Sequence, residues 1–125
     1  MSASNEPTER SFDNLLARVV RFRDERDWAQ FHHPKDLAVS IAIEAAELLE
    51  LFQWKDPEAV REQLREPEGR QRAGEEMADV LILLLSAADA IGVDLYQATI
   101  EKIAVNAEKY PVEKARGNAR KYDEL

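Results

Sequence analysis

The sequence contains no cysteine in its 125 residues. This absence excludes disulfide bonds, thiolate zinc sites and cysteine nucleophiles, and it suits the reducing cytoplasm, where we expect the protein to act. A chain of this length is close to the commonest size for one domain and can bury a core without a disulfide or a metal. We therefore expect a flexible N-terminal tail at residues 1–10 and a single domain at residues 11–125.

Signals for export or membrane insertion are also missing. The N-terminal stretch MSASNEPTER has no apolar segment of the kind found in secretory signals. The longest strongly apolar run, MADVLILLLSAADAIG, contains Asp79 and Asp89 and is short for a membrane span. We expect a soluble protein with no membrane partner.

An excess of positive charge is lacking, because the formal net charge is −8 at pH 7. An acidic surface argues against binding to nucleic acid polymers or anionic membranes. The exception is the segment from Lys102 to Lys121, in which six lysines and arginines outnumber two glutamates, giving +4. This segment is either a solvated helix end and tail or an arm that binds an anionic ligand.

Glycine and proline are few, four and five respectively, and they separate stretches whose apolar residues recur at helical spacing. No stretch shows strand alternation bounded by hairpin turns. Predicted helices span residues 11–31, 34–52, 56–65, 67–92 and 94–110, and residues 111–125 form a basic C-terminal arm. Prolines at the start of three helices, aspartates before two and a glycine after the fourth support these limits.

This pattern predicts an all-α fold, a bundle of four to five helices. The helices at 34–52 and 67–92 are apolar around most of their circumference, so we expect them at the centre of the bundle. A bundle this small often gains a further buried face by self-association, which favours a homo-oligomer.

Two pairs of acidic residues border the apolar stretches of these central helices. Glu44 and Glu47, in IAIEAAELLELFQW, are spaced i, i+3 and share one helix face. Glu76 and Asp79, in GEEMADVLILLL, form a second such pair, with Glu75 as an i, i+4 alternative to Glu76. Packing the two helices against each other would bring four carboxylates together.

Such a cluster needs a compensating positive charge. Two like charges about 4 Å apart repel by roughly 4 kcal/mol at an effective dielectric constant of 20, and neither motif contains lysine or arginine. Either protonation or a divalent cation would relieve the repulsion, and hard oxygen ligands suit Mg²⁺, with Mn²⁺ as a substitute. The alternative is that the acids are exposed and only solvate the helices.

Several motifs, taken in chain order, resemble a known family. The motif EAAE at Glu44–Glu47, then EEMAD with Glu76 and Asp79, and KIAVN at Lys102–Asn106 resemble the all-α nucleoside triphosphate pyrophosphohydrolases of the MazG kind. The stretches RDWAQFH, ELLELFQW, EKYP and ARKYDEL are similar to its dCTP pyrophosphatase branch. The resemblance covers residues 12–125, nearly the whole chain.

The resemblance implies a Mg²⁺-dependent hydrolase that cleaves nucleoside triphosphates between the α and β phosphates, releasing a monophosphate and pyrophosphate. Its implied role is house-cleaning of the nucleotide pool. Carried onto this chain, the metal ligands are Glu44, Glu47, Glu76 and Asp79, and we assign Glu47 as the catalytic base. The resemblance also implies a dimer or tetramer with active sites shared between subunits.

The substrate-binding candidates combine phosphate-binding groups with aromatic rings that can stack on a base. Basic residues of the C-terminal arm would contact phosphates, either of their own subunit or of a neighbour. His33 is expected to cap a helix or face solvent. The full candidate set is Lys102, Asn106, Tyr110, Trp28, His32, Trp54, Arg116, Arg120 and Lys121.

Base specificity is open at two positions. In mammalian members of the branch, a histidine and a tyrosine of the base pocket align with Val19 and Leu83, where this chain has aliphatic residues. A pyrimidine deoxynucleotide, dCTP or a 5-modified dCTP, is the leading substrate.

Two other classes compete with this interpretation. A di-iron or di-manganese carboxylate bundle would need Glu-x-x-His motifs, and both histidines lie outside the acidic motifs. The second alternative is a catalytically silent oligomeric helical protein with a binding or regulatory role.

Overall fold

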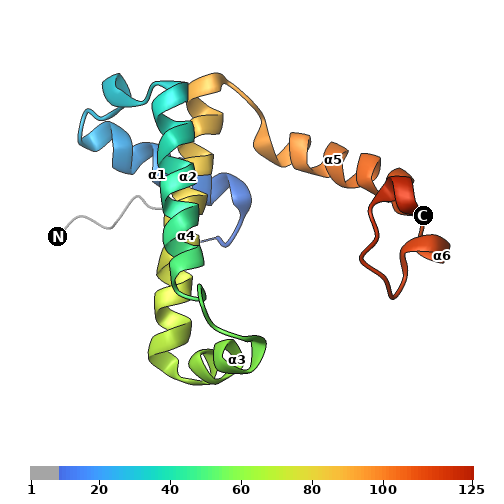
Figure 1. Cartoon of the computed structure of the whole chain (residues 1–125). Coiled ribbons are helices and arrows are strands. Elements are labelled where there is room, and N and C mark those ends of the chain that lie inside the picture. The colour runs from blue at the N-terminus through green and yellow to red at the C-terminus, as the bar shows by residue number, and fades with distance from the viewer. Residues whose placement is uncertain (1–8) are drawn as a thin grey trace. The chain divides into compact units, whose positions relative to one another are not determined.

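The structure, a computed structural model, describes residues 9–125, which form helices joined by turns and contain no strand (Figure 1). The predicted all-α fold is confirmed. The helices are α1 (Phe12–Glu25), η1 (Ala29–Phe31), α2 (Pro34–Glu50), α3 (Pro57–Arg65), α4 (Pro67–Ile91), α5 (Leu95–Lys109), α6 (Val112–Ala115) and η2 (Tyr122–Glu124), where η marks a 3-10 helix.

The chain divides into two compact units, one ending at Gly92 and the other comprising Val93–Leu125. The single-domain organisation of residues 11–125 stays a prediction. Most of the expected N-terminal tail lies outside the described residues. No helix within residues 9–125 has both the length and the apolar character needed to cross a membrane.

The helix limits follow the capping signals in the sequence. The side chains of Ser11, Asp56 and Asp94 accept hydrogen bonds from backbone N–H groups three residues later, at 3.2, 2.8 and 2.9 Å. The Nδ1 of His33 accepts a hydrogen bond from the N–H of Lys35 at 3.2 Å, so His33 caps α2. A cap was one of the two expected roles of this residue. Gly92 ends α4 with a φ of 82°, a left-handed conformation that glycine adopts without a steric penalty.

The first helix ends earlier than predicted. It stops at Glu25 rather than near Phe31, because Asp27 adopts a left-handed φ of 53° and turns the chain into η1. The N–H of Trp28 donates to the carbonyl of Arg23 at 3.1 Å and so closes the turn. No glycine or proline marks this position, so the apolar spacing alone extended the predicted helix too far.

Helix α4 is the centre of the first unit. It packs against α2, α3 and α1, most extensively against α2, which lies beside it (Figure 1). Leu85 of α4 is fully buried, and Leu37 and Leu51 are buried at the two ends of α2. The predicted central position is confirmed for α4, and the face that α4 shares with α2 positions the acidic residues.

The second unit contains the predicted basic arm. The arm includes α6 and η2, and it folds back on the end of α5 through an edge-to-face contact between Tyr110 and Tyr122, with ring centroids 6.3 Å apart. The Nζ of Lys109 lies 4.9 Å from the centroid of the Tyr122 ring. The arm is therefore ordered by contacts with its own unit.

Candidate functional site

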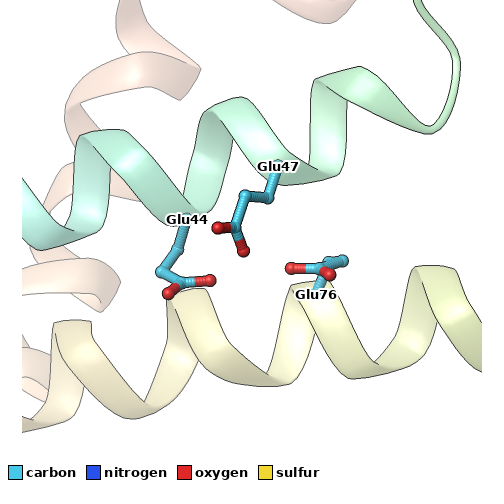
Figure 2. Close-up of side chains that lie close together, drawn as sticks. All are labelled: Glu44, Glu47 and Glu76. Carbon is cyan, nitrogen blue, oxygen red and sulfur yellow. The ribbon is translucent and has the colours of Figure 1, made fainter.

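Three carboxylates meet between α2 and α4. Glu44 and Glu47 extend from one face of α2 towards α4, and Glu76 extends from α4 towards them (Figure 2). Each residue offers a carboxylate oxygen, and these three oxygens lie within 4.8 Å of one another. The i, i+3 spacing on α2 produces the pair, and the α2–α4 packing brings in the third residue.

The local environment disfavours negative charge on this cluster. All three residues are half-buried, and one oxygen each of Glu44 and Glu76 is buried without a hydrogen-bond partner. The pKa of Glu44 is raised, first because its carboxyl lies within hydrogen-bonding reach of Glu47, then by burial and by neighbouring negative charges. The pKa of Glu76 is raised first by burial and then by the charge of Glu47, with Arg72 opposing in part.

The donor set fits a hard divalent cation. The cluster offers oxygen alone, with no sulfur or imidazole nitrogen, which favours Mg²⁺ or Mn²⁺ over softer metals. A bound cation would satisfy the two unpartnered oxygens and remove the repulsion that raises both pKa values. The residues present therefore fit the metal that the sequence motifs imply.

Asp79 and Glu75 lie outside this group of three. Asp79 is exposed, although its charge contributes to the raised pKa values of Glu44 and Glu76. Glu75 is also exposed, and it accepts a hydrogen bond from the side chain of Gln71 at 3.2 Å. The structure thus brings together three of the four predicted ligands and leaves Asp79 at the margin of the cluster.

An apolar groove of about 230 Å³ lies between α1 and α4. It is lined by Leu15, Arg18, Val19, Phe22 and Ile82. Ile82 follows Glu76 by six residues, which is about 9 Å along an α-helix. Of the lining residues, sequence reasoning singled out only Val19, although Leu15, Val19 and Phe22 share one helix face by their spacing. A larger hollow of about 530 Å³ at the start of α1 contains none of the predicted site residues.

The predicted aromatic candidates occupy different surroundings. Trp28 packs edge-on against Phe22 of the groove, with ring centroids 5.7 Å apart and an interplanar angle of 76°. The Nδ1 of His32 is buried without a hydrogen-bond partner. Trp54, just after α2, is 93% exposed and has a left-handed φ of 67°. An exposed tryptophan in this strained conformation contributes little to the core and is available to a ligand.

The predicted phosphate-binding residues all lie in the second unit. Lys102 and Asn106 are exposed on α5, one helical turn apart. Tyr110 follows α5, while Arg116, Arg120 and Lys121 are exposed in the arm. Their meeting with the carboxylate cluster stays a prediction.

The chain is thus an all-α protein in which two packed helices present glutamates to each other, an arrangement that could hold a divalent metal ion. The model of the MazG-like family matches residues 39–125, which include all four predicted metal ligands. The chain belongs to the MazG-like family, as its motifs predicted.

Known relatives agree with this assignment. dCTP pyrophosphatase 1 from Bos taurus is 43% identical over 124 residues, which is 99% of this chain and 72% of that protein. The Homo sapiens protein of the same name is 42% identical, over 99% of this chain and 71% of its own length. Among solved structures, a pyrophosphatase from Archaeoglobus fulgidus DSM 4304 aligns with a TM-score of 0.73 and 40% identity, covering 86% of this chain and 99% of that one.

Proposed function

We propose that this protein is a metal-dependent hydrolase that cleaves deoxynucleoside triphosphates between the α and β phosphates. The products would be a nucleoside monophosphate and pyrophosphate, and the role would be to clear surplus or noncanonical nucleotides in the cytoplasm. The observation that carries the proposal is the cluster of Glu44, Glu47 and Glu76, with its two unpartnered buried oxygens. Relatives named as dCTP pyrophosphatases support the same reaction.

The acidic side chains would divide two tasks between them. Glu44 and Glu76, with Asp79 at the margin, would hold Mg²⁺, or Mn²⁺ in its place, which supplies positive charge for the triphosphate and lowers the pKa of a bound water. Glu47 offers a carboxylate oxygen within 4.8 Å of an oxygen of each of its two neighbours. Its carboxylate would accept the proton of the attacking water. Lys102 and the basic arm would stabilise the charge that develops on the leaving pyrophosphate.

The groove between α1 and α4 would receive the nucleobase. It begins about 9 Å along α4 from Glu76, which suits a nucleotide whose phosphates lie at the carboxylates. The apolar walls and the adjacent Trp28 provide surfaces for an aromatic ring. A pyrimidine deoxynucleotide such as dCTP is the proposed substrate, with Val19 in place of a polar base contact.

We also propose that the working form is a homo-oligomer, a dimer or tetramer. Two helices carry exposed apolar residues at helical spacing, an arrangement that usually marks an interaction surface. The residues are 39% to 60% exposed, and they are Met77, Leu81, Leu84 and Ile91 on α4 and Tyr96, Ile100 and Ile103 on α5. Neither a nucleic acid polymer nor a membrane is a proposed partner.

The proposal is tested by incubating the purified protein with a panel of ribo- and deoxynucleoside triphosphates in Mg²⁺ and resolving the products by chromatography. Glu47→Gln should lower the turnover rate at least 100-fold, as expected for the loss of a general base. Glu50→Gln is the matched control, because Glu50 is exposed on the same helix and outside the cluster. Absence of turnover with any nucleotide in Mg²⁺ or Mn²⁺ would favour the catalytically silent alternative.

A further inference from the structure

A mostly buried arginine joins the end of α1 to the end of α4. The side chain of Arg23 is 12% exposed. Its Nη1 lies 2.5 Å from Oδ2 of Asp89, and its Nη2 and Nε lie 2.8 and 2.9 Å from Oδ1 of Asp24. Hydrogen bonds between two charged groups are about twice as strong as neutral ones. The hydrogen bond to Asp89 is also the main reason that the pKa of Arg23 is raised.

The backbone of the same two α1 residues holds the turn that follows the helix. The carbonyl of Arg23 accepts hydrogen bonds from the N–H groups of Arg26 and Trp28, at 3.2 and 3.1 Å. The carbonyl of Asp24 accepts from the N–H of Asp27 at 3.0 Å, where the chain takes its left-handed turn. The turn that carries Trp28 is therefore attached to Arg23, whose side chain binds Asp89 of α4.

The ring of Trp28 is placed beside the groove by this turn. It packs edge-on against Phe22, which lines the groove together with Ile82 of α4. The guanidinium of Arg26 lies 3.8 Å from the centroid of the Phe22 ring. Trp28 itself remains 44% exposed. A small change in the angle between the end of α1 and α4 would thus move both rings relative to Ile82.

We propose that Arg23 and Asp89 are positioning residues, which set the place of Trp28 and thereby the affinity for the nucleobase. This inference rests on the proposed function. Asp89 follows Glu76 by 13 residues, so it lies about 20 Å along α4 from the carboxylate cluster. It is too distant to touch a metal or a phosphate, and its effect on the reaction passes through Trp28.

The kinetic test uses Asp89→Asn, which keeps the shape of the side chain and removes its charge. We expect KM for the best triphosphate to rise about tenfold, equivalent to about 1.4 kcal/mol, while kcat changes less than twofold. This split is expected because a misplaced base contact weakens the ground state and the transition state alike. Asp89→Glu, which keeps the charge, should restore most of the affinity.

The matched control is Glu25→Gln, which breaks the exposed Arg21–Glu25 pair of the same helix, a contact of 2.8 Å. It should leave KM unchanged. If Asp89→Asn does not fold, as judged by circular dichroism, Arg23→Lys is the second variant, because it keeps the charge and loses the forked geometry. An unchanged KM in a folded variant, or a fall in kcat alone, would overturn the inference.

A spectroscopic readout separates this inference from the proposed function. With Trp54 replaced by phenylalanine, tryptophan emission reports on Trp28 alone, because the chain has two tryptophans. We expect Asp89→Asn to shift the emission of Trp28 to longer wavelength in the absence of nucleotide, and Glu25→Gln to leave it unchanged. If the wild-type protein cleaves no triphosphate, the proposed function fails, and unchanged Trp28 emission in Asp89→Asn would overturn the positioning role independently.

Discussion

At Glu44 and Glu76, one oxygen of each carboxylate is buried and lacks a hydrogen-bond partner. Buried polar groups are normally paired, and a buried charge without a partner is destabilising. The arrangement therefore destabilises the metal-free fold, and it provides a site that is ready to bind a cation. The i, i+3 spacing predicted this grouping only for the case in which the two helices pack through their acidic faces, and it left open that the acids are exposed.

These raised pKa values predict how stability depends on pH. A glutamate in an unfolded chain titrates near pH 4.3, and both groups titrate at higher pH in the fold. Protonation of these two glutamates therefore stabilises the folded state. This stabilisation is complete below the pKa of a glutamate in the unfolded chain, and it is lost as the pH rises through the higher pKa of the folded state. In a chelator, Glu47→Gln should weaken this dependence, because Glu47 is a main cause of both shifts.

Mg²⁺ should oppose this loss. A cation that binds the ionised cluster stabilises the native state at neutral pH and competes with protons as pH falls. Thermal unfolding measured from pH 5 to pH 8, with Mg²⁺ and with a chelator, should show the largest gain from Mg²⁺ at the high end. An equal gain at all pH values would show that the cation binds elsewhere. Glu50→Gln, outside the cluster, should behave like the wild type.

Asp79 marks the limit of what spacing can predict. It shares a helix face with Glu76 in the sequence pattern, yet it is exposed and lies outside the group of three. Which of two neighbouring acids faces α2 depends on how the helices are rotated against each other. That rotation is set by side-chain packing along the whole interface, which no single motif encodes.

Among the elements, α4 has Gly74 in its interior and Gly92 directly after its last residue, and substituting the two is expected to have opposite effects. Gly92 has a φ of 82° and no atom within 4 Å of an added Cβ, so Gly92→Ala would be opposed by backbone strain alone. We expect a loss of about 1 kcal/mol in the free energy of unfolding. Gly74 lies inside the helix with equally open surroundings. Gly74→Ala should therefore stabilise the protein by about 0.5–1 kcal/mol.

Urea unfolding of the two variants measures both effects in the same helix. If Gly92→Ala were neutral, the left-handed end of α4 would be wrong. If Gly74→Ala were destabilising, that face of α4 would have to be covered in solution, since the described chain leaves it open. The second outcome would point to the oligomer interface.

Local signals predicted the elements well where glycine, proline or a capping residue ended them. The limits of α2, α3, α4 and α5 agree with the sequence within two residues. The end of α1 was not predicted correctly, because Asp27 carries no strong local signal for a turn. The turn is attached to Arg23, whose partner Asp89 lies 66 residues further along the chain. The spacing of apolar residues along a helix does not predict a tertiary ion pair of this kind.

At the scale of the whole molecule, the apolar residues of α4 and α5 proposed to form a subunit interface are 39% to 60% exposed. If they pack between subunits, replacing Ile100 and Ile103 with glutamate should lower the mass measured by light scattering towards that of one chain. Glu101→Gln, on the same helix, should keep the wild-type mass. A wild-type protein that is monomeric at working concentrations would contradict the proposed oligomer.

The MazG-like match covers residues 39–125 rather than the whole chain. The MazG-like match begins at residue 39, so it contains α4 and the acidic pairs and excludes α1, which supplies most of the groove. The match therefore includes the carboxylates proposed to hold the metal, while most of the groove proposed to receive the nucleobase lies outside it. The alignments with the relatives named as dCTP pyrophosphatases include α1 as well, and dCTP is therefore the first substrate to test.

The most direct test of the central claim is phosphorus NMR of dCTP incubated with the protein and Mg²⁺. The account predicts resonances of dCMP and pyrophosphate growing together in equal amounts, and their absence with Glu47→Gln but not with Glu50→Gln. The appearance of dCDP with orthophosphate would place the cleavage at the β–γ bond instead. That result, or equal turnover by Glu47→Gln, would contradict the assignment of this carboxylate site to α–β hydrolysis.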